Sequence, residues 1–203
     1  MQKTVKTSGY SETTEKKSKF IGLAVYAEGE ERVNDILSAL RREHRGARHI
    51  VYAYRLLSGA EKYSDDGEPY GTAGQPLLEL LRREGYTAAA LFAVRYFGGV
   101  LLGRGGLTRA YVCCAKAALD SSEDGFLCEA VNFAAVCDYE SYERLTVLLN
   151  ESGAKINDSS FTEAVTVNAY IEKEKYESFA DAALSAFARK INIEKISEGT
   201  RVI

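Results

Sequence analysis

Three arginines, Arg95, Arg104 and Arg109, lie in a stretch that also holds five glycines, a combination that could bind an anion. The glycines are Gly98, Gly99, Gly103, Gly105 and Gly106. Glycine lets the backbone approach a neighbour or ligand closely, and a glycine loop that opens a helix points free N–H groups outward. Guanidinium groups match phosphate geometry. The stretch therefore predicts either a tight packing corner or an anion site.

Two familiar nucleotide fingerprints are absent from this stretch. A Walker A motif needs Gly-Lys-Ser/Thr, which does not occur here. A dinucleotide fingerprint counted from Gly103 would need its third glycine where Thr108 stands. The arginines, rather than a glycine signature, carry the anion hypothesis.

A second stretch, residues 64–76, reads SDDGEPYGTAGQP and contains three carboxylates, Asp65, Asp66 and Glu68. Aspartate side chains can bind backbone N–H groups two residues on, and Gly and Pro fix turns. The spacing fails the calcium-loop pattern, but one or two carboxylates and a bound phosphate can hold Mg²⁺. We favour a rigid structural loop and leave magnesium open. Besides the three carboxylates, the candidate residues of this loop motif are His49, Gly67, Gly71, Thr72 and Gly74.

A local basic run lies between residues 41 and 55, where five arginines face only Glu43. They are Arg41, Arg42, Arg45, Arg48 and Arg55. Because the whole chain has a net charge of −3, any contact with nucleic acid would be local. The alternative is a solvated helix end.

The sequence gives little support to nucleophilic catalysis, to a metal site or to a membrane-spanning segment. We predict that all four cysteines, Cys113, Cys114, Cys128 and Cys137, are small core residues in a reducing compartment. The chain has two histidines, no Gly-X-Ser-X-Gly elbow and no apolar run near the roughly 18 residues that span a bilayer. The polar N-terminus does not resemble a secretory signal, so we expect a cytoplasmic protein with no membrane partner and no cofactor or metal.

Periodicity places these stretches on a regular framework. Apolar runs predict strands, and apolar residues at helical spacing, such as Val33, Leu37 and Leu40, predict amphipathic helices. The expected strands are 19–27, 48–57 and 87–96, the expected helices are 30–45, 75–84 and 107–121, and 58–74 is expected to be a loop.

The remaining sequence predicts a β-α-β-β-α-β order, which is the ferredoxin-like pattern. Strands are expected at 126–137, 154–161, 163–172 and from 191, and helices at 139–152 and 175–190. We therefore predict an α+β protein of two domains, residues 1–128 and 129–203.

The sequence resembles the IMPACT/YigZ family. The resemblance rests on Lys17–Ile21, on Ala47 and His49, and on the motifs SDDGEPYGTAGQP at 64–76 and RYFGGVLLGRGGLTRAY at 95–111. It implies a first domain with the fold of the second domain of ribosomal protein S5, and a ferredoxin-like second domain similar to late domains of elongation factor G. Eukaryotic relatives regulate translation.

Residues and resemblance together favour a non-catalytic, translation-associated protein that binds RNA, the ribosome or a translation factor through its first domain. Its anion or nucleic-acid binding candidates are the glycines and arginines of 95–109, Tyr96, and Arg41, Arg42, Arg45 and Arg48. The alternative is an enzyme acting on a phosphorylated small molecule or nucleotide, with phosphate on the glycine loop and Mg²⁺ on Asp65, Asp66 and Glu68. A third interpretation is structural, in which Asp65 or Asp66 caps backbone or pairs with Arg95 or Arg109.

Overall fold

A computed structural model describes residues 2–188 and 190–203, which form two compact units. One unit is the chain up to Leu127 together with Val202–Ile203, and the other is Cys128–Arg201. Helices and strands occur in both units, so the mixed, two-domain fold predicted from the sequence is confirmed. In the part of the chain that the structure describes, no helix is long and apolar enough to cross a membrane.

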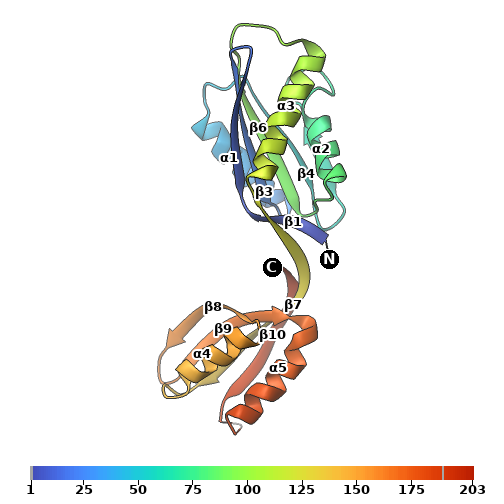
Figure 1. Ribbon diagram of the computed structural model, residues 1–203. Coiled ribbons are helices and arrows are strands. Elements are labelled where there is room, and N and C mark those ends of the chain that lie inside the picture. Colours follow the sequence, from blue (N-terminus) through green and yellow to red (C-terminus); the bar gives the residue numbers. More distant parts are fainter. Residues whose placement is uncertain (1, 189) are drawn as a thin grey trace. The chain divides into compact units, whose positions relative to one another are not determined.

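The first unit is built around a five-stranded antiparallel sheet with the order β2-β3-β6-β4-β5 (Figure 1). Its elements are β1 (Gln2–Thr7), β2 (Gly9–Glu15), β3 (Ser18–Tyr26), α1 (Glu30–Glu43), β4 (His49–Arg55), β5 (Glu61–Ser64), α2 (Gly74–Arg83), β6 (Ala89–Tyr96) and α3 (Gly103–Asp120).

The central strand β6 is buried on both faces because helices cover both sides of the sheet. Leu91 and Ala93 belong to a core shared with α2 and α3, whereas Phe92 and Val94 belong to a core shared with α1. Figure 1 shows α2 and α3 on one side and α1 on the other. The continuous apolar run of this strand follows from that double burial.

The second unit has the strand order β10-β7-β9-β8, as expected for a ferredoxin-like sheet. Its elements are β7 (Glu123–Cys137), α4 (Tyr142–Glu151), β8 (Lys155–Phe161), β9 (Val165–Glu172), α5 (Lys173–Ala186) and β10 (Asn192–Val202). Alternate residues of β7 and β9, such as Phe133 and Val167, pack with α4 and α5. The first residues of β7 pair instead with β1, in the first unit.

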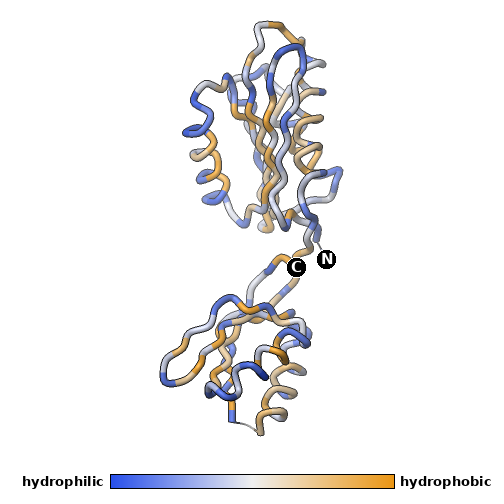
Figure 2. The backbone as a smooth tube through the Cα atoms, turned by 60° about the vertical axis from the view of Figure 1, so that its left-hand side comes forward, coloured by the Kyte–Doolittle hydropathy of each residue, from blue (hydrophilic) through white to orange (hydrophobic). Residues whose placement is uncertain are grey.

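Hydrophobic stretches run through the middle of each unit, and hydrophilic ones gather at turns and on helix faces (Figure 2). Several expected boundaries are corrected. Strands β1 and β2 were not predicted, the expected loop 58–74 contains β5, and α3 begins at Gly103 rather than at Leu107. Helix α5 ends at Ala186; the predicted extension to Lys190 includes Arg189, which lies outside the described residues.

Candidate functional site

A buried ion pair lies at one end of the first unit's sheet. Arg95, near the end of β6, is 5% exposed, and Glu68 is 7% exposed. The guanidinium Nη1 of Arg95 donates to Glu68 Oε1 at 2.6 Å, and the Tyr111 hydroxyl of α3 donates to the same oxygen at 2.7 Å. Burial, together with this hydrogen bond, raises the pKa of Tyr111, which therefore stays a protonated donor.

Strand register brings the partners of this pair together. Arg95 lies opposite His49 of β4 on one side and Phe20 of β3 on the other. The guanidinium lies 5.6 Å from the centre of the Phe20 ring and 5.5 Å from that of Phe97. Because Glu68 comes from the turn-rich segment between β5 and α2, that segment closes over the end of the sheet.

Asp65 holds the acidic segment in shape through three backbone hydrogen bonds. Its carboxylate accepts from the N–H groups of Gly71 at 2.9 Å, Ala73 at 3.1 Å and Gly74 at 2.8 Å. Gly74 is required by close packing, since an added Cβ would lie 2.6 Å from the carbonyl oxygen of Ser64. The segment is thus a self-bonded structure that starts α2.

Asp66 fastens the same segment to β4. Its Oδ2 accepts from the Ile50 N–H at 2.8 Å, its carbonyl oxygen accepts from His49 Nδ1 at 2.7 Å, and Arg41 lies 3.6 Å from Oδ1. All three carboxylates predicted as magnesium ligands therefore have protein partners. Within residues 2–188 and 190–203, no group of three His, Cys, Asp or Glu side chains is arranged to hold a metal ion.

The structural interpretation needs one correction. The sequence pointed to Asp65 or Asp66 as the partner of Arg95 or Arg109, but the partner of Arg95 is Glu68. Asp65 accepts from backbone N–H groups of its own loop and Asp66 from the Ile50 N–H of β4, so only Glu68 is directed into the buried end of the sheet.

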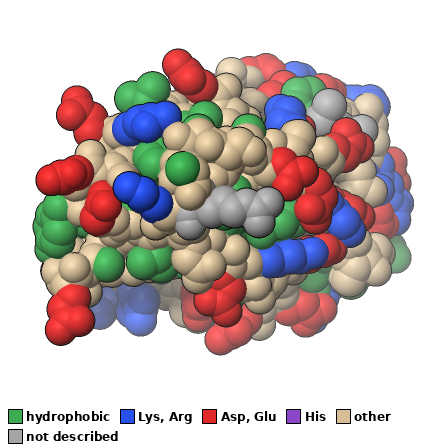
Figure 3. All heavy atoms as spheres, turned by 90° about the horizontal axis from the view of Figure 1, so that it is seen from below, with side chains coloured by type: hydrophobic (Ala, Val, Ile, Leu, Met, Phe, Trp, Pro, Cys, Tyr) green, Lys and Arg blue, Asp and Glu red, His purple; other side chains and the backbone are tan. Residues whose placement is uncertain are grey.

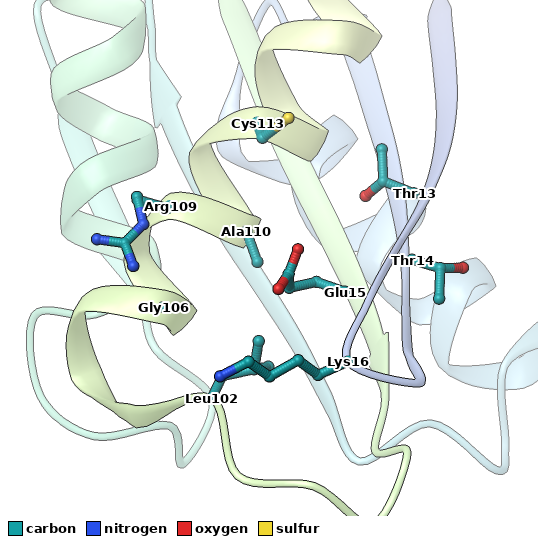
Figure 4. A pocket seen from close by; sticks show the side chains of 9 residues that line it. All are labelled: Thr13, Thr14, Glu15, Lys16, Leu102, Gly106, Arg109, Ala110 and Cys113. Atoms are coloured by element: carbon teal, nitrogen blue, oxygen red, sulfur yellow. The ribbon is translucent and has the colours of Figure 1, made fainter.

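Arg109 lines a pocket of about 340 Å³ that neither of the other two arginines of the motif lines. The pocket lies between the β2–β3 hairpin and α3, and Figure 4 shows Glu15 and Lys16 reaching from the hairpin toward the helix. Arg109 and Cys113 line it from α3. Glu15 offsets one of the two positive charges that Lys16 and Arg109 bring to this pocket. The pocket is therefore poorly suited to a multiply charged anion.

Arg95 and Arg104 line a different and larger pocket, with a volume of about 530 Å³. Apolar side chains form its walls, and Glu68 and His49 accompany Arg95 inside it; the apolar residues are Pro69, Phe97, Leu101, Leu102 and Leu107. The exposed Arg48 and Arg104, together with Gly67 and Gly103, complete the lining. This pocket, which we call the motif pocket, draws its lining from both sequence motifs.

The basic run is split between pairing and free surface. Arg41 faces Asp66, and Arg55 binds Glu61 and the Tyr86 carbonyl oxygen. Among the described residues no ion pair involves Arg42, Arg45 or Arg48, and all three are exposed. These unpaired arginines give the first unit a local positive charge. By contrast, on the face seen from below in Figure 3, acidic and basic side chains lie next to one another.

The glycines of the motif divide between packing and helix initiation. A Cβ on Gly98 would lie 2.0 Å from the Lys17 carbonyl, so this glycine lets two backbone segments touch, and its N–H donates to Ser18 Oγ at 3.1 Å. Gly103, Gly105 and Gly106 lie in the first turn of α3, and Gly99 precedes it. The predicted packing corner is present, and it leads directly into the helix.

Two residues of the site were missed by sequence reasoning. Tyr111 and Phe97 both fall inside the motif 95–111, yet neither was assigned a role. An aromatic hydroxyl in an alanine-rich helix was a usable signal for Tyr111. The adjacent Tyr96, a candidate anion binder, has its hydroxyl 3.0 Å from His44 Nδ1, and its role in anion binding stays a prediction. The prediction that all four cysteines are core residues is wrong, because Cys113 is exposed.

Family models match most of both parts of the chain. The family model of the Impact N-terminal domain matches residues 16–119, and a domain of unknown function, DUF1949, matches residues 136–188. The chain is 33% identical over 180 residues to IMPACT family member YigZ of Escherichia coli (strain K12), covering 86% of this chain and 87% of that protein. It is 30% identical over 182 residues to IMPACT family member YvyE of Bacillus subtilis (strain 168), covering 88% and 83%.

One solved structure, described as a hypothetical protein, aligns over 97% of this chain and 98% of its own length, with 27% identity and a TM-score of 0.62. Both motif segments that form the site, 64–76 and 95–111, fall within the part of the chain that the Impact N-terminal domain model matches. The chain belongs to the IMPACT family.

Proposed function

We propose that this chain is a translation-associated regulator that works without catalysis, by binding RNA or an RNA-bearing surface of the ribosome through its first unit. Family membership supports the link to translation, because the eukaryotic members of the family regulate it. For a protein with this role we expect a cytoplasmic location.

The observation that carries the proposal is that, at the end of the sheet where the two motifs meet, the carboxylates are bound by protein groups, whereas two exposed arginines form no ion pair among the described residues. The three carboxylates there are engaged by backbone N–H groups and by Arg41 and Arg95. The exposed Arg48 makes no ion pair within the described residues, and Arg104 donates only to the Tyr70 carbonyl oxygen. Exposed arginines beside exposed aromatic rings are suited to phosphate and unstacked bases.

An enzyme that holds Mg²⁺ on the acidic loop is less well supported. Asp65 accepts three backbone hydrogen bonds, so binding a metal there would cost the loop the hydrogen bonds that hold its shape. The pairing of Glu68 with Arg95 likewise removes its charge from the open surface. Thermal-shift screening against nucleotides, with and without Mg²⁺, tests this alternative directly, because a Mg²⁺-dependent shift that is lost in Asp66→Asn would support it.

The binding experiment compares wild type with Arg48→Ala/Arg104→Ala, using fluorescence anisotropy on single-stranded and structured RNA over a range of salt concentrations. Each phosphate contact on a single strand contributes about 0.7 to the salt slope, so the double variant should lose about 1.4. Cosedimentation with ribosomes from lysate gives a second readout of the same variant.

A matched control is Arg32→Ala/Arg83→Ala, which removes two exposed arginines remote from the motif pocket. It should keep the wild-type slope and affinity. Wild-type protein that binds no RNA at low salt and does not cosediment with ribosomes would refute the proposal. Equal losses in both double variants would reduce the effect to net charge and would also refute it.

A further inference from the structure

Arg95, a lining residue of the motif pocket, has a buried hydrogen-bond donor with no partner among the described residues. Arg95 is 5% exposed, and its Nε is the one buried side-chain nitrogen or oxygen without a hydrogen bond among the described residues. A buried donor left without an acceptor is energetically unfavourable. Because Arg95 lines the pocket, an acceptor atom on a ligand is a natural partner for this N–H.

An acceptor lies beside that donor. His49 Nδ1 approaches the Asp66 carbonyl oxygen at 2.7 Å, and a carbonyl oxygen can only accept, so Nδ1 carries the proton. In the neutral ring Nε2 is then an acceptor, and it lies 3.8 Å from Glu68 Oε1. His49, Glu68 and Arg95 together present acceptors and a donor to the same pocket.

The walls and the rim differ sharply from this polar interior. Phe97 is 47% exposed, Leu101 is 83% exposed, and both line the pocket together with buried Leu102 and Leu107. The cations Arg48 and Arg104 are exposed at the same pocket. A ligand that fits must combine a flat apolar body, a polar edge and a negative charge.

We propose that the motif pocket binds one nucleotide, with its base against Phe97, the edge of the base toward Arg95, Glu68 and His49, and its phosphate at Arg48 and Arg104. The volume of about 530 Å³ lies within the usual range for small-ligand sites. The edge of every base carries donors and acceptors, so the pocket favours a base over a bare sugar phosphate. This inference rests on the RNA-binding role proposed above, with the nucleotide presented either free or as an unstacked position in RNA.

The test uses the full chain and four probes: uridine 5′-monophosphate, ribose 5-phosphate, a single-stranded RNA hexamer and the same hexamer in a duplex. Calorimetry should give uridine 5′-monophosphate an affinity at least about fivefold above that of ribose 5-phosphate, since base–aromatic stacking contributes at least that much. The single strand should bind at least about tenfold more tightly than the duplex, whose bases are already stacked.

Phe97→Ala should weaken binding of the hexamer by about tenfold, whereas Val100→Ala, which shortens a neighbouring exposed side chain outside the pocket lining, should change it by less than about twofold. A rim variant, Leu101→Glu, which places a negative charge beside the phosphate position, should also weaken it, with Val100→Glu as its control. Leu101 is so exposed that this variant tests the pocket without disturbing the core.

The outcomes separate the two proposals. Hexamer binding that depends on Arg48 and Arg104 but is unchanged by Phe97→Ala and Leu101→Glu keeps the RNA role and overturns the pocket. Binding of uridine 5′-monophosphate without any binding of the hexamer keeps the pocket as a site for free nucleotides and overturns the RNA role. Equal affinity for uridine 5′-monophosphate and ribose 5-phosphate overturns the base position.

Discussion

Removing the charge of Glu68 should destabilise the first unit by several kcal/mol. In Glu68→Gln the side chain keeps its volume and an oxygen that can accept from Arg95 and Tyr111, so the main loss is the negative charge. Both members of the pair are almost fully buried and lie 2.6 Å apart. A buried cation left without its counter-ion costs about 3–5 kcal/mol, and the retained amide places Glu68→Gln near 3 kcal/mol.

Hydrogen exchange of the backbone amides of β6 measures this loss, because these amides report the opening of the first unit even if the two units unfold separately. Glu79→Gln, which neutralises an exposed carboxylate on α2, is the control and should change stability by less than about 0.5 kcal/mol. The double variant Glu68→Gln/Arg95→Met should cost clearly less than the sum of its single variants, because it leaves no buried charge. Additive costs, or a Glu68→Gln protein as stable as wild type, would refute the ion-pair argument.

Asp65→Ala should destabilise the first unit by about 3 kcal/mol, because three backbone N–H groups lose a charged acceptor. Urea denaturation measures this loss, and a change below about 1 kcal/mol would contradict the capping role. Gly98→Ala should cost about 2 kcal/mol in the same assay because its Cβ overlaps the Lys17 carbonyl, whereas Gly46→Ala, which meets only an ordinary contact, should cost little. Exposed Cys113 should react with a thiol reagent far faster than Cys114, whose pKa is raised by burial; mass spectrometry finding the reverse order would contradict the burial.

Sequence periodicity located the elements whose buried faces are apolar. Helix α1, for example, buries Val33, Leu37 and Leu40 at helical spacing, and β6 is apolar throughout. Strand β2 escaped prediction because its inward residues are Gly9 and Ser11 rather than large hydrophobic ones.

Close packing explains that choice of residues in β2. Ser11 Oγ donates to the Cys114 carbonyl oxygen of α3 at 2.7 Å, and a Cβ on Gly9 would overlap the Ala118 carbonyl oxygen. A helix that approaches so near a strand selects for small side chains, and hydropathy alone does not register such a contact.

The candidate site could be predicted only as two neighbouring motifs. The sequence offered three carboxylates in the acidic segment, and which of them meets Arg95 depends on how the chain turns between β5 and α2. Positive φ angles at Asp66 and Gly67 set that turn and direct Glu68 inward. The unpaired Nε of Arg95 and the placement of Arg109 and Arg104 in different pockets emerge only from three-dimensional packing.

The central place of β6 in the sheet has a consequence for how the chain acquires its structure during synthesis. Strands β2–β3 and β4–β5 form two local hairpins, but the strand that joins them comes later, at Ala89–Tyr96. Until it is made, one edge of β3 and one edge of β4 have unpaired backbone groups, which is a known route to aggregation. A nascent chain that stalls before residue 89 therefore has two separate hairpins with unpaired strand edges, and the eight residues of β6 join them into one five-stranded sheet.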